Sequence, residues 1–170
     1  WGLPAGFSIC SVSDRLLKKS ESLANKGYFL DLLTYRKYFF KQQTPTTPSI
    51  PHMFGLKYVI NKIKSEGIEN RWKRHVEMAE CTRNWALSHG QKFFTKENAL
   101  SNTLTCIDNI KKWDINKINE ELLSNGYRMD RGYGKYKGRA FRVPHMGNIY
   151  MDDLKDYLDK IDEILCRLKY

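Results

Sequence analysis

Three prolines within the seven residues from Pro45 to Pro51 most constrain how this 170-residue chain can fold. A proline has no backbone N–H and disfavours the helical conformation in the residue before it, so a continuous helix is not expected to pass through this segment. We therefore expect the chain to divide here into a shorter N-terminal part and a longer C-terminal part. The total length allows one domain, or one domain plus part of a second.

The part before these prolines contains few regular patterns. Gly6–Ser13 is a strand-like run, bounded by glycine and by Asp14. Ser13 or Asp14 can cap a short helix over residues 15–22, because each offers a side-chain oxygen to unpaired backbone donors. The residues that follow are rich in aromatic side chains but irregular, and no element is expected there.

After the prolines, apolar residues recur every three or four positions and predict a series of helices. Short β-branched and aromatic runs between them predict strands. Helices are expected over 52–67, 68–89, 115–126 and 151–168, and strands over 93–94, 104–107 and 140–143. From about residue 68 this order is typical of a small α+β layer, with helices on one face of a short sheet.

Twenty-nine Lys and Arg against 19 Asp and Glu give the chain a formal net charge of +10. The excess is concentrated between Arg128 and Arg142, where six basic residues and interleaved tyrosines accompany a single acid, Asp130. Such a stretch can bind single-stranded nucleic acid by phosphate contact and stacking, which leaves a basic RNA-binding module open. No RNP, KH or zinc-finger signature accompanies it. No apolar run approaches the length of a membrane span.

The four cysteines and four histidines are scattered along the chain. No C-x-x-C pair and no H-E-x-x-H motif occurs, so the spacing favours neither a protein-held metal nor a compact disulfide scaffold. This use of cysteine fits a reducing, cytoplasmic setting.

Arg142 lies between Phe141 and Val143 in an expected strand. It either points to solvent or presents its planar fork to a carboxylate or phosphate. The glycines from Gly132 to Gly138 do not have the spacing of a nucleotide-binding loop. Thr44, Thr46 and Thr47 can bind an anion, but threonine beside proline is also ordinary turn chemistry.

Five short motifs follow one another along nearly the whole chain. They are Leu3–Gly6 with Ser13–Arg15, Tyr28–Asp31, Gln43–Pro48, Glu66–His75 and Phe141–Gly147. Together they resemble the C-terminal portion of class V, fold type I pyridoxal-phosphate aminotransferases, in the serine-pyruvate and alanine-glyoxylate branch.

The resemblance implies an α/β fold of the fold type I pyridoxal-phosphate transferases. Residues 1–47 would end the large cofactor-binding domain, 48–67 would form a linking helix, and 68–170 a small α+β domain with helices packed on a short, mainly antiparallel sheet. Arg142 would grip the substrate α-carboxylate. Thr47 would reach the cofactor phosphate of the neighbouring subunit, and Thr44 lies where many relatives place a tyrosine that contacts this phosphate.

The implied enzyme is a homodimer that transfers an amino group from a small amino acid, serine or alanine, to a 2-oxo acid, glyoxylate or pyruvate. The cofactor lysine would lie two residues before Trp1. The chain is thus expected to be the C-terminal portion of a longer polypeptide, to need the upstream half and to be inactive alone. Neither a membrane nor nucleic acid is expected as a partner. Another pyridoxal-phosphate chemistry on the same class V fold is the alternative. Cysteine desulfurases of this class use a cysteine shortly before the carboxylate-binding arginine, and no cysteine lies between Gly126 and Arg142, which argues against desulfuration.

Overall fold

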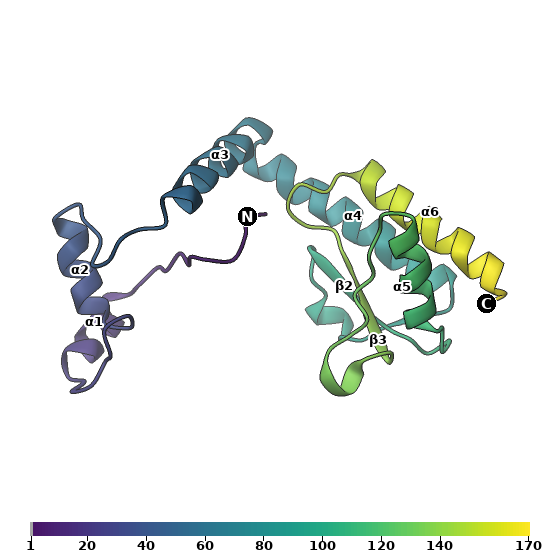
Figure 1. Ribbon diagram of the computed structural model, residues 1–170, viewed down its shortest axis with the longest axis horizontal. Coiled ribbons are helices and arrows are strands. Elements are labelled where there is room, and N and C mark those ends of the chain that lie inside the picture. The colour runs from purple at the N-terminus through teal and green to yellow at the C-terminus, as the bar shows by residue number, and fades with distance from the viewer. Residues whose placement is uncertain (1) are drawn as a thin grey trace. The chain divides into compact units, whose positions relative to one another are not determined.

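The computed structural model describes residues 2–170 (Figure 1). By its internal contacts the chain divides into two compact units, Leu3–Ile60 and Asn61–Tyr170. Within residues 2–170, no helix combines the length and apolar character that crossing a bilayer requires.

The first unit contains α1 (Asp14–Glu21), α2 (Leu32–Phe40) and the beginning of α3 (Ile50–Glu66). The helix expected after Ser13 is confirmed, and the Ser13 side chain accepts a hydrogen bond from the backbone N–H of Leu16. Helix α2 was not expected. Asp31 caps it by accepting from the backbone N–H of Leu33 at 3.1 Å and from the Thr34 hydroxyl at 2.7 Å.

Two further differences from the sequence-based expectations lie in this unit. The strand expected over Gly6–Ser13 is wrong, because this segment is not paired with any strand in the described part of the chain and an unpaired segment cannot form a ladder. Helix α3 begins at Ile50, so Pro51 lies in its first turn. Proline is tolerated there because the backbone N–H it lacks would have no partner within the helix.

The second unit is built on a three-stranded antiparallel sheet in the order β1 (Lys92–Phe93), β2 (Leu104–Asp108), β3 (Ala140–Pro144). All three expected strands are therefore confirmed. The register places Cys106 opposite Arg142 and Ile107 opposite Phe141.

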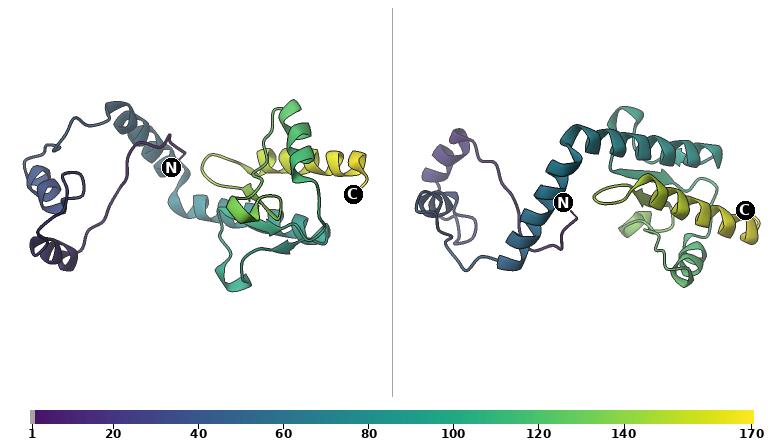
Figure 2. Two further views of the ribbon diagram at one scale, coloured as in Figure 1. Left: turned by 60° about the horizontal axis from the view of Figure 1, so that its bottom comes forward. Right: turned by 90° about the horizontal axis from the view of Figure 1, so that it is seen from above.

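Three long helices pack with this sheet: α4 (Ile68–Ser88), α5 (Ile115–Ser124) and α6 (Met151–Leu168). In Figures 1 and 2, α4 and α6 run side by side, and α4 also contacts β1 and β2. Asp114 caps α5 as expected, accepting from the backbone N–H of Lys117. Two short 3₁₀ turns, η1 (Glu97–Ala99) and η2 (Gly134–Tyr136), complete the unit. The expected α+β architecture, with helices on a short antiparallel sheet, is confirmed.

The two faces of the sheet differ in burial. Ile107, Phe141 and Val143 are fully buried and join the core formed with the three helices. Because side chains alternate along a strand, Cys106 and Arg142 point to the opposite face, where both are only partly buried. The more open face of the sheet therefore carries the expected substrate-binding arginine.

Candidate functional site

The Arg142 guanidinium is held by one carboxylate. Its Nε donates to Oδ1 of Asp130 at 2.8 Å, and its Nη2 donates to Oδ2 at 2.5 Å. The side chains remain 35% and 29% exposed, respectively, so the pair lies at the surface of the second unit. This is a bidentate pair of the kind that the planar fork of arginine favours.

The turn after Asp130 fixes this carboxylate. The backbone N–H of Gly132 donates to Oδ1 of Asp130 at 3.0 Å. Gly132 has φ +81°, and a Cβ there would lie 2.5 Å from the carbonyl oxygens of both Ala140 and Tyr136, so only glycine fits. On the other side, Asn119 accepts from the backbone N–H of Met129 at 2.9 Å. Asp130 is thus anchored by the backbone on both sides as well as by Arg142.

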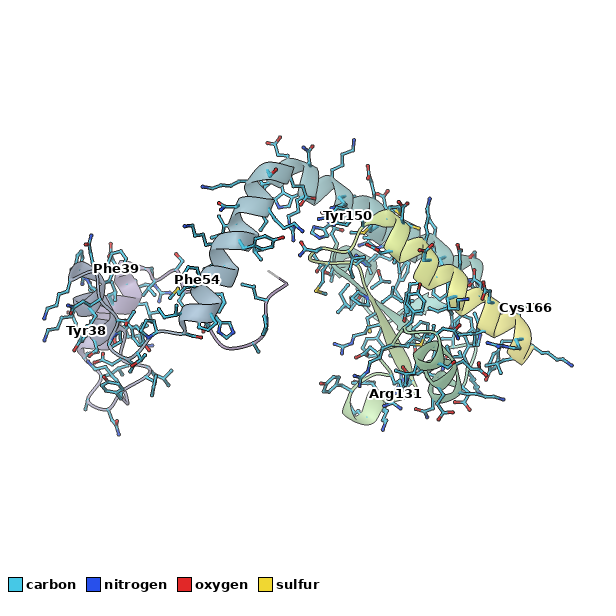
Figure 3. All side chains as sticks on the ribbon, turned by 45° about the horizontal axis from the view of Figure 1, so that its top comes forward. Tyr38, Phe39, Phe54, Arg131, Tyr150 and Cys166 are labelled. Carbon is cyan, nitrogen blue, oxygen red and sulfur yellow. The ribbon has the colours of Figure 1, made fainter. Side chains whose placement is uncertain are left out.

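Two more side chains lie beside the pair. The Tyr133 ring lies against the Arg142 guanidinium, 5.3 Å from ring centre to Cζ. Cys106 lies opposite Arg142 on the neighbouring strand, and burial raises the pKa of its thiol. This disfavours a reactive thiolate. The pKa of Asp130 lies below its ordinary value of 3.8, mainly because of the hydrogen bonds from Arg142. Arg131 lies on the loop that carries Asp130 and Tyr133 (Figure 3).

The pairing leaves one edge of Arg142 available. Asp130 uses Nε and one hydrogen of Nη2, and no acceptor in residues 2–170 pairs with Nη1. Nη1 and the second hydrogen of Nη2 form a second fork that can bind a carboxylate end-on. The arrangement can therefore bind an external carboxylate without breaking the pair with Asp130.

A second charged cluster ties the segment after β3 to the start of α4. Arg74 donates from Nε to Glu66 at 2.7 Å, from Nη2 to the carbonyl of Gly147 at 3.2 Å, and from Nη1 to the carbonyl of Ile149. Its guanidinium also lies over the ring of Tyr150, which Figure 3 shows at the start of α6. The motifs at 66–75 and 141–147 therefore meet in the second unit.

His145 is fully buried directly after β3. Its Nδ1 lies 3.2 Å from the carbonyl oxygen of Asn102, which can only accept, so Nδ1 carries the proton. Its Nε2 then accepts from the Thr105 hydroxyl at 2.8 Å. Burial lowers the pKa of His145 to about 4, so the ring is neutral at pH 7. This histidine has a packing role and fixes the end of the strand that carries Arg142.

The comparisons with known proteins find aminotransferases among the relatives of this chain. No protein-family model matches the chain. An uncharacterised aminotransferase of Methanocaldococcus jannaschii is 36% identical over 150 residues, which are 85% of this chain and 38% of that protein. A serine–glyoxylate aminotransferase of Arabidopsis thaliana is 32% identical over 173 residues, covering 99% of this chain and 43% of the relative. The chain is homologous to the C-terminal portion of class V aminotransferases.

The structural comparison shows the same fold. A pyridoxamine–pyruvate aminotransferase from Mesorhizobium loti has a TM-score of 0.82 to this chain at 21% identity, over 94% of this chain and 42% of that one. The chain thus has the fold of the C-terminal portion of fold type I aminotransferases. It spans about two fifths of the length of the relatives that it matches.

The two threonines expected at the cofactor lie in the first unit, and Arg142 lies in the second. Thr44 is exposed and borders an open cleft of about 670 Å³ beside Phe39 and Phe40. Its hydroxyl donates to the carbonyl of Thr46 at 2.6 Å, so its proton is already committed. Thr47 is exposed, and its hydroxyl has no hydrogen-bond partner within residues 2–170. The Thr47 hydroxyl is thus available to donate to a phosphate oxygen of pyridoxal phosphate, the cofactor that the family resemblance implies. The Thr44 hydroxyl, as placed here, is not.

Sequence reasoning named Arg142 as a candidate site residue but missed the carboxylate that pairs with it. Asp130 was noted only as the single acid among six basic residues between Arg128 and Arg142. That isolation was the available signal, because one carboxylate inside a basic stretch is well placed to pair with one of its neighbours. Gly132 and Tyr133 also lie at this site. From the sequence, Gly132 was considered only for the spacing of a nucleotide-binding loop and Tyr133 only as one of the tyrosines in the basic stretch.

Proposed function

We propose that the complete protein containing this chain is a pyridoxal-phosphate-dependent aminotransferase. It transfers an amino group from a small amino acid, serine or alanine, to a 2-oxo acid, glyoxylate or pyruvate. Relatives named as serine–glyoxylate and alanine–glyoxylate aminotransferases support this choice of substrates. The observation that carries the proposal is Arg142, on the open face of the sheet with one fork of its guanidinium available.

In this proposal the chain supplies binding groups for substrate and cofactor. Arg142 binds and orients the α-carboxylate of the amino acid through its free fork. Thr47 donates a hydrogen bond to the cofactor phosphate of the neighbouring subunit. Thr44 contributes to the same phosphate site only if its hydroxyl gives up the hydrogen bond to the carbonyl of Thr46. Pyridoxal phosphate, when bound, supplies the electron sink that lets the α-proton of the amino acid be removed.

The remaining parts of the enzyme are proposed to lie outside this chain. The upstream half would provide most of the cofactor domain and the cofactor lysine, two residues before Trp1, so that this chain would be inactive alone. Residues 1–47 would complete that large domain, 48–67 would link it to the small domain, and 68–170 would form the small domain. The enzyme would act in the cytoplasm as a homodimer whose active sites are shared across the interface.

The deciding experiment is Arg142→Ala in the complete protein. Loss of a charge-assisted, bidentate contact removes roughly 2 to 4 kcal/mol of binding, so KM for the amino acid is expected to rise by tens-fold or more. Arg142→Lys should recover only part of this, because an ammonium group lacks the planar fork. An unchanged KM in Arg142→Ala would remove Arg142 from the substrate site.

The basic stretch from Arg128 to Arg142 leaves RNA binding as the alternative function. In the structure, Lys135 and Arg139 lie against the ring of Tyr136, whose neighbour is Phe94 at 5.0 Å. These contacts compete with stacking of Tyr136 on a base. An RNA-binding module predicts a salt-sensitive affinity for oligonucleotides that falls when Lys135, Lys137 and Arg139 are neutralised. An aminotransferase predicts little oligonucleotide binding above the non-specific background.

A further inference from the structure

We propose that Asp130 is a positioning residue for Arg142, which holds the guanidinium by one edge so that the other edge is presented to the substrate carboxylate. The inference rests on the proposed function, since it assumes that Arg142 binds that carboxylate. It adds a residue that the sequence motifs do not contain, and it makes the site a three-part arrangement of Asp130, Arg142 and Tyr133.

The first argument is the division of the guanidinium donors. Asp130 binds the edge formed by Nε and Nη2, at 2.8 and 2.5 Å. The edge formed by Nη1 and Nη2 is left without an acceptor in residues 2–170. A guanidinium can bind two carboxylates at once through these two edges, because each edge offers two parallel N–H groups. Asp130 and a substrate carboxylate are therefore not competitors for the same hydrogens.

The second argument is that Asp130 is itself fixed. Its Oδ1 accepts from the backbone N–H of Gly132, in a turn whose φ of +81° and close carbonyl contacts require glycine. The backbone N–H of Arg142 in turn faces the carbonyl of Asp130 at 3.4 Å. A carboxylate held in this way is a rigid support and not a mobile group that occupies the arginine until substrate arrives.

The third argument is the freedom that Arg142 would otherwise have. The side chain is 35% exposed, and an unrestrained arginine at such a site loses much rotamer freedom when it orders on a ligand. Asp130 fixes one edge and Tyr133 lies against the guanidinium, so that freedom is already lost before substrate binds. Binding groups ordered in advance give tighter binding than the same groups ordered by the ligand.

The test is Asp130→Asn in the complete protein, with L-alanine and L-serine as donors and glyoxylate as acceptor. Asparagine keeps an oxygen for the Gly132 N–H but loses the charge and the second acceptor for Arg142. KM for the amino acid is expected to rise roughly fivefold or more, with kcat within about twofold. The reason is that the contact between Arg142 and the substrate carboxylate is weakened in the ground state and the transition state alike. The dissociation constant of propionate for the cofactor-free protein, measured by calorimetry, is expected to rise by the same factor.

Asp108→Asn is the matched control. Asp108 lies on the same face of the sheet, opposite Ala140, and makes no side-chain hydrogen bond with Arg142. Its KM and propionate affinity should equal those of the unchanged protein. A KM in Asp130→Asn that is unchanged or lower, while Arg142→Ala raises it, overturns the positioning role and leaves the proposed function standing. An unchanged KM in Arg142→Ala removes Arg142 from the substrate site, and the positioning role of Asp130 fails with it.

If Asp130→Asn does not fold, Asp130→Glu provides the second test. Glutamate keeps the charge but moves the carboxylate by one methylene, so the guanidinium is displaced from its present orientation. A raised KM and a raised propionate dissociation constant, at an unchanged thermal midpoint, are expected. Values equal to those of the unchanged protein would overturn the proposal.

Discussion

Arg74 donates from Nε to Oε1 of Glu66 at 2.7 Å, while Arg71 donates from Nη1 to the other oxygen of the same carboxylate at 2.9 Å. The three side chains are mostly buried, with exposures of 20% for Glu66, 14% for Arg74 and 9% for Arg71. Because Arg74 also donates to the carbonyls of Gly147 and Ile149, one carboxylate at the end of α3 supports the segment between β3 and α6.

Glu66→Gln is therefore expected to lower the stability of the complete protein by roughly 2 to 4 kcal/mol, because it leaves two largely buried cations with a neutral partner. The thermal unfolding midpoint measures this. The control is Glu77→Gln, which breaks an exposed pair with Lys73 at 3.9 Å and should change stability by less than about 1 kcal/mol. Equal midpoints for the two variants would contradict a supporting role for Glu66.

The same cluster predicts a pH dependence. The pKa of Glu66 lies below its ordinary value of 4.5, mainly because of the hydrogen bond from Arg74. The folded state thus favours the ionised carboxylate, and this stabilisation is complete above pH 4.5 and is lost as the pH falls through the folded-state pKa. In Glu66→Gln, the free energy of unfolding should lack the part that the unchanged protein loses when Glu66 is protonated. An acid transition of the same steepness in both proteins would argue against it.

Gly132 and Gly134 provide a matched pair of substitutions in the loop that carries Asp130. Gly132→Ala should destabilise the protein by about 2 kcal/mol or more, because the left-handed φ costs about 1 to 2 kcal/mol and the new Cβ meets two carbonyl oxygens at 2.5 Å. Gly134→Ala should destabilise the protein only by the cost of the left-handed φ, since no atom lies within 4 Å of its Cβ position. The thermal midpoint and KM for the amino acid are the measurements.

Only Gly132→Ala should also raise KM, because the shift of the turn moves the N–H that holds Asp130 and so loosens Arg142. A raised KM in Gly134→Ala of equal size would show that general loop stability, and not the Asp130 contact, governs substrate binding.

The sequence predicted those features that depend on neighbours along the chain. Helices α4 to α6 followed from apolar spacing, and Asp114 marked the start of α5 because a cap acts within one turn. Helix α2 was missed because nine residues rich in aromatics show little periodicity, although Asp31 followed by Thr34 was a capping signal. The strand expected over Gly6–Ser13 failed because a strand depends on a partner that the pattern of one segment does not reveal.

The candidate site shows the same division. Arg142 was named as a candidate through the family resemblance, while its place in an apolar strand left its role open. Its pairing with Asp130 depends on how the loop turns back onto β3 across 12 residues. Nothing in the spacing specifies that return. The glycine at 132, where a side chain would meet two carbonyl oxygens, is the residue that permits it.

His145 predicts a second pH effect, at higher pH. Its folded-state pKa of about 4 lies below the ordinary 6.5, so the unfolded chain binds a proton that the folded protein does not between these values. Stability should therefore fall as the pH is lowered from 6.5 towards 4, by up to about 3 kcal/mol from this residue. In His145→Gln the thermal midpoint should depend less on pH over that range. Identical pH profiles would show that His145 does not contribute.

Substitutions of Thr47 and Thr44 test the proposed cofactor contact separately from substrate binding. Thr47→Val removes a hydroxyl that has no partner within residues 2–170. The dissociation constant of pyridoxal phosphate for the complete protein should therefore rise by roughly tenfold to a hundredfold, because one hydrogen bond to a charged group contributes about 1.5 to 3 kcal/mol. KM for the amino acid should stay unchanged, because the proposed substrate contact is made by Arg142 and not by Thr47. Thr44→Val is the control, with a smaller effect, since its hydroxyl is committed to Thr46. Equal cofactor affinity in Thr47→Val and the unchanged protein would exclude Thr47 from the phosphate site.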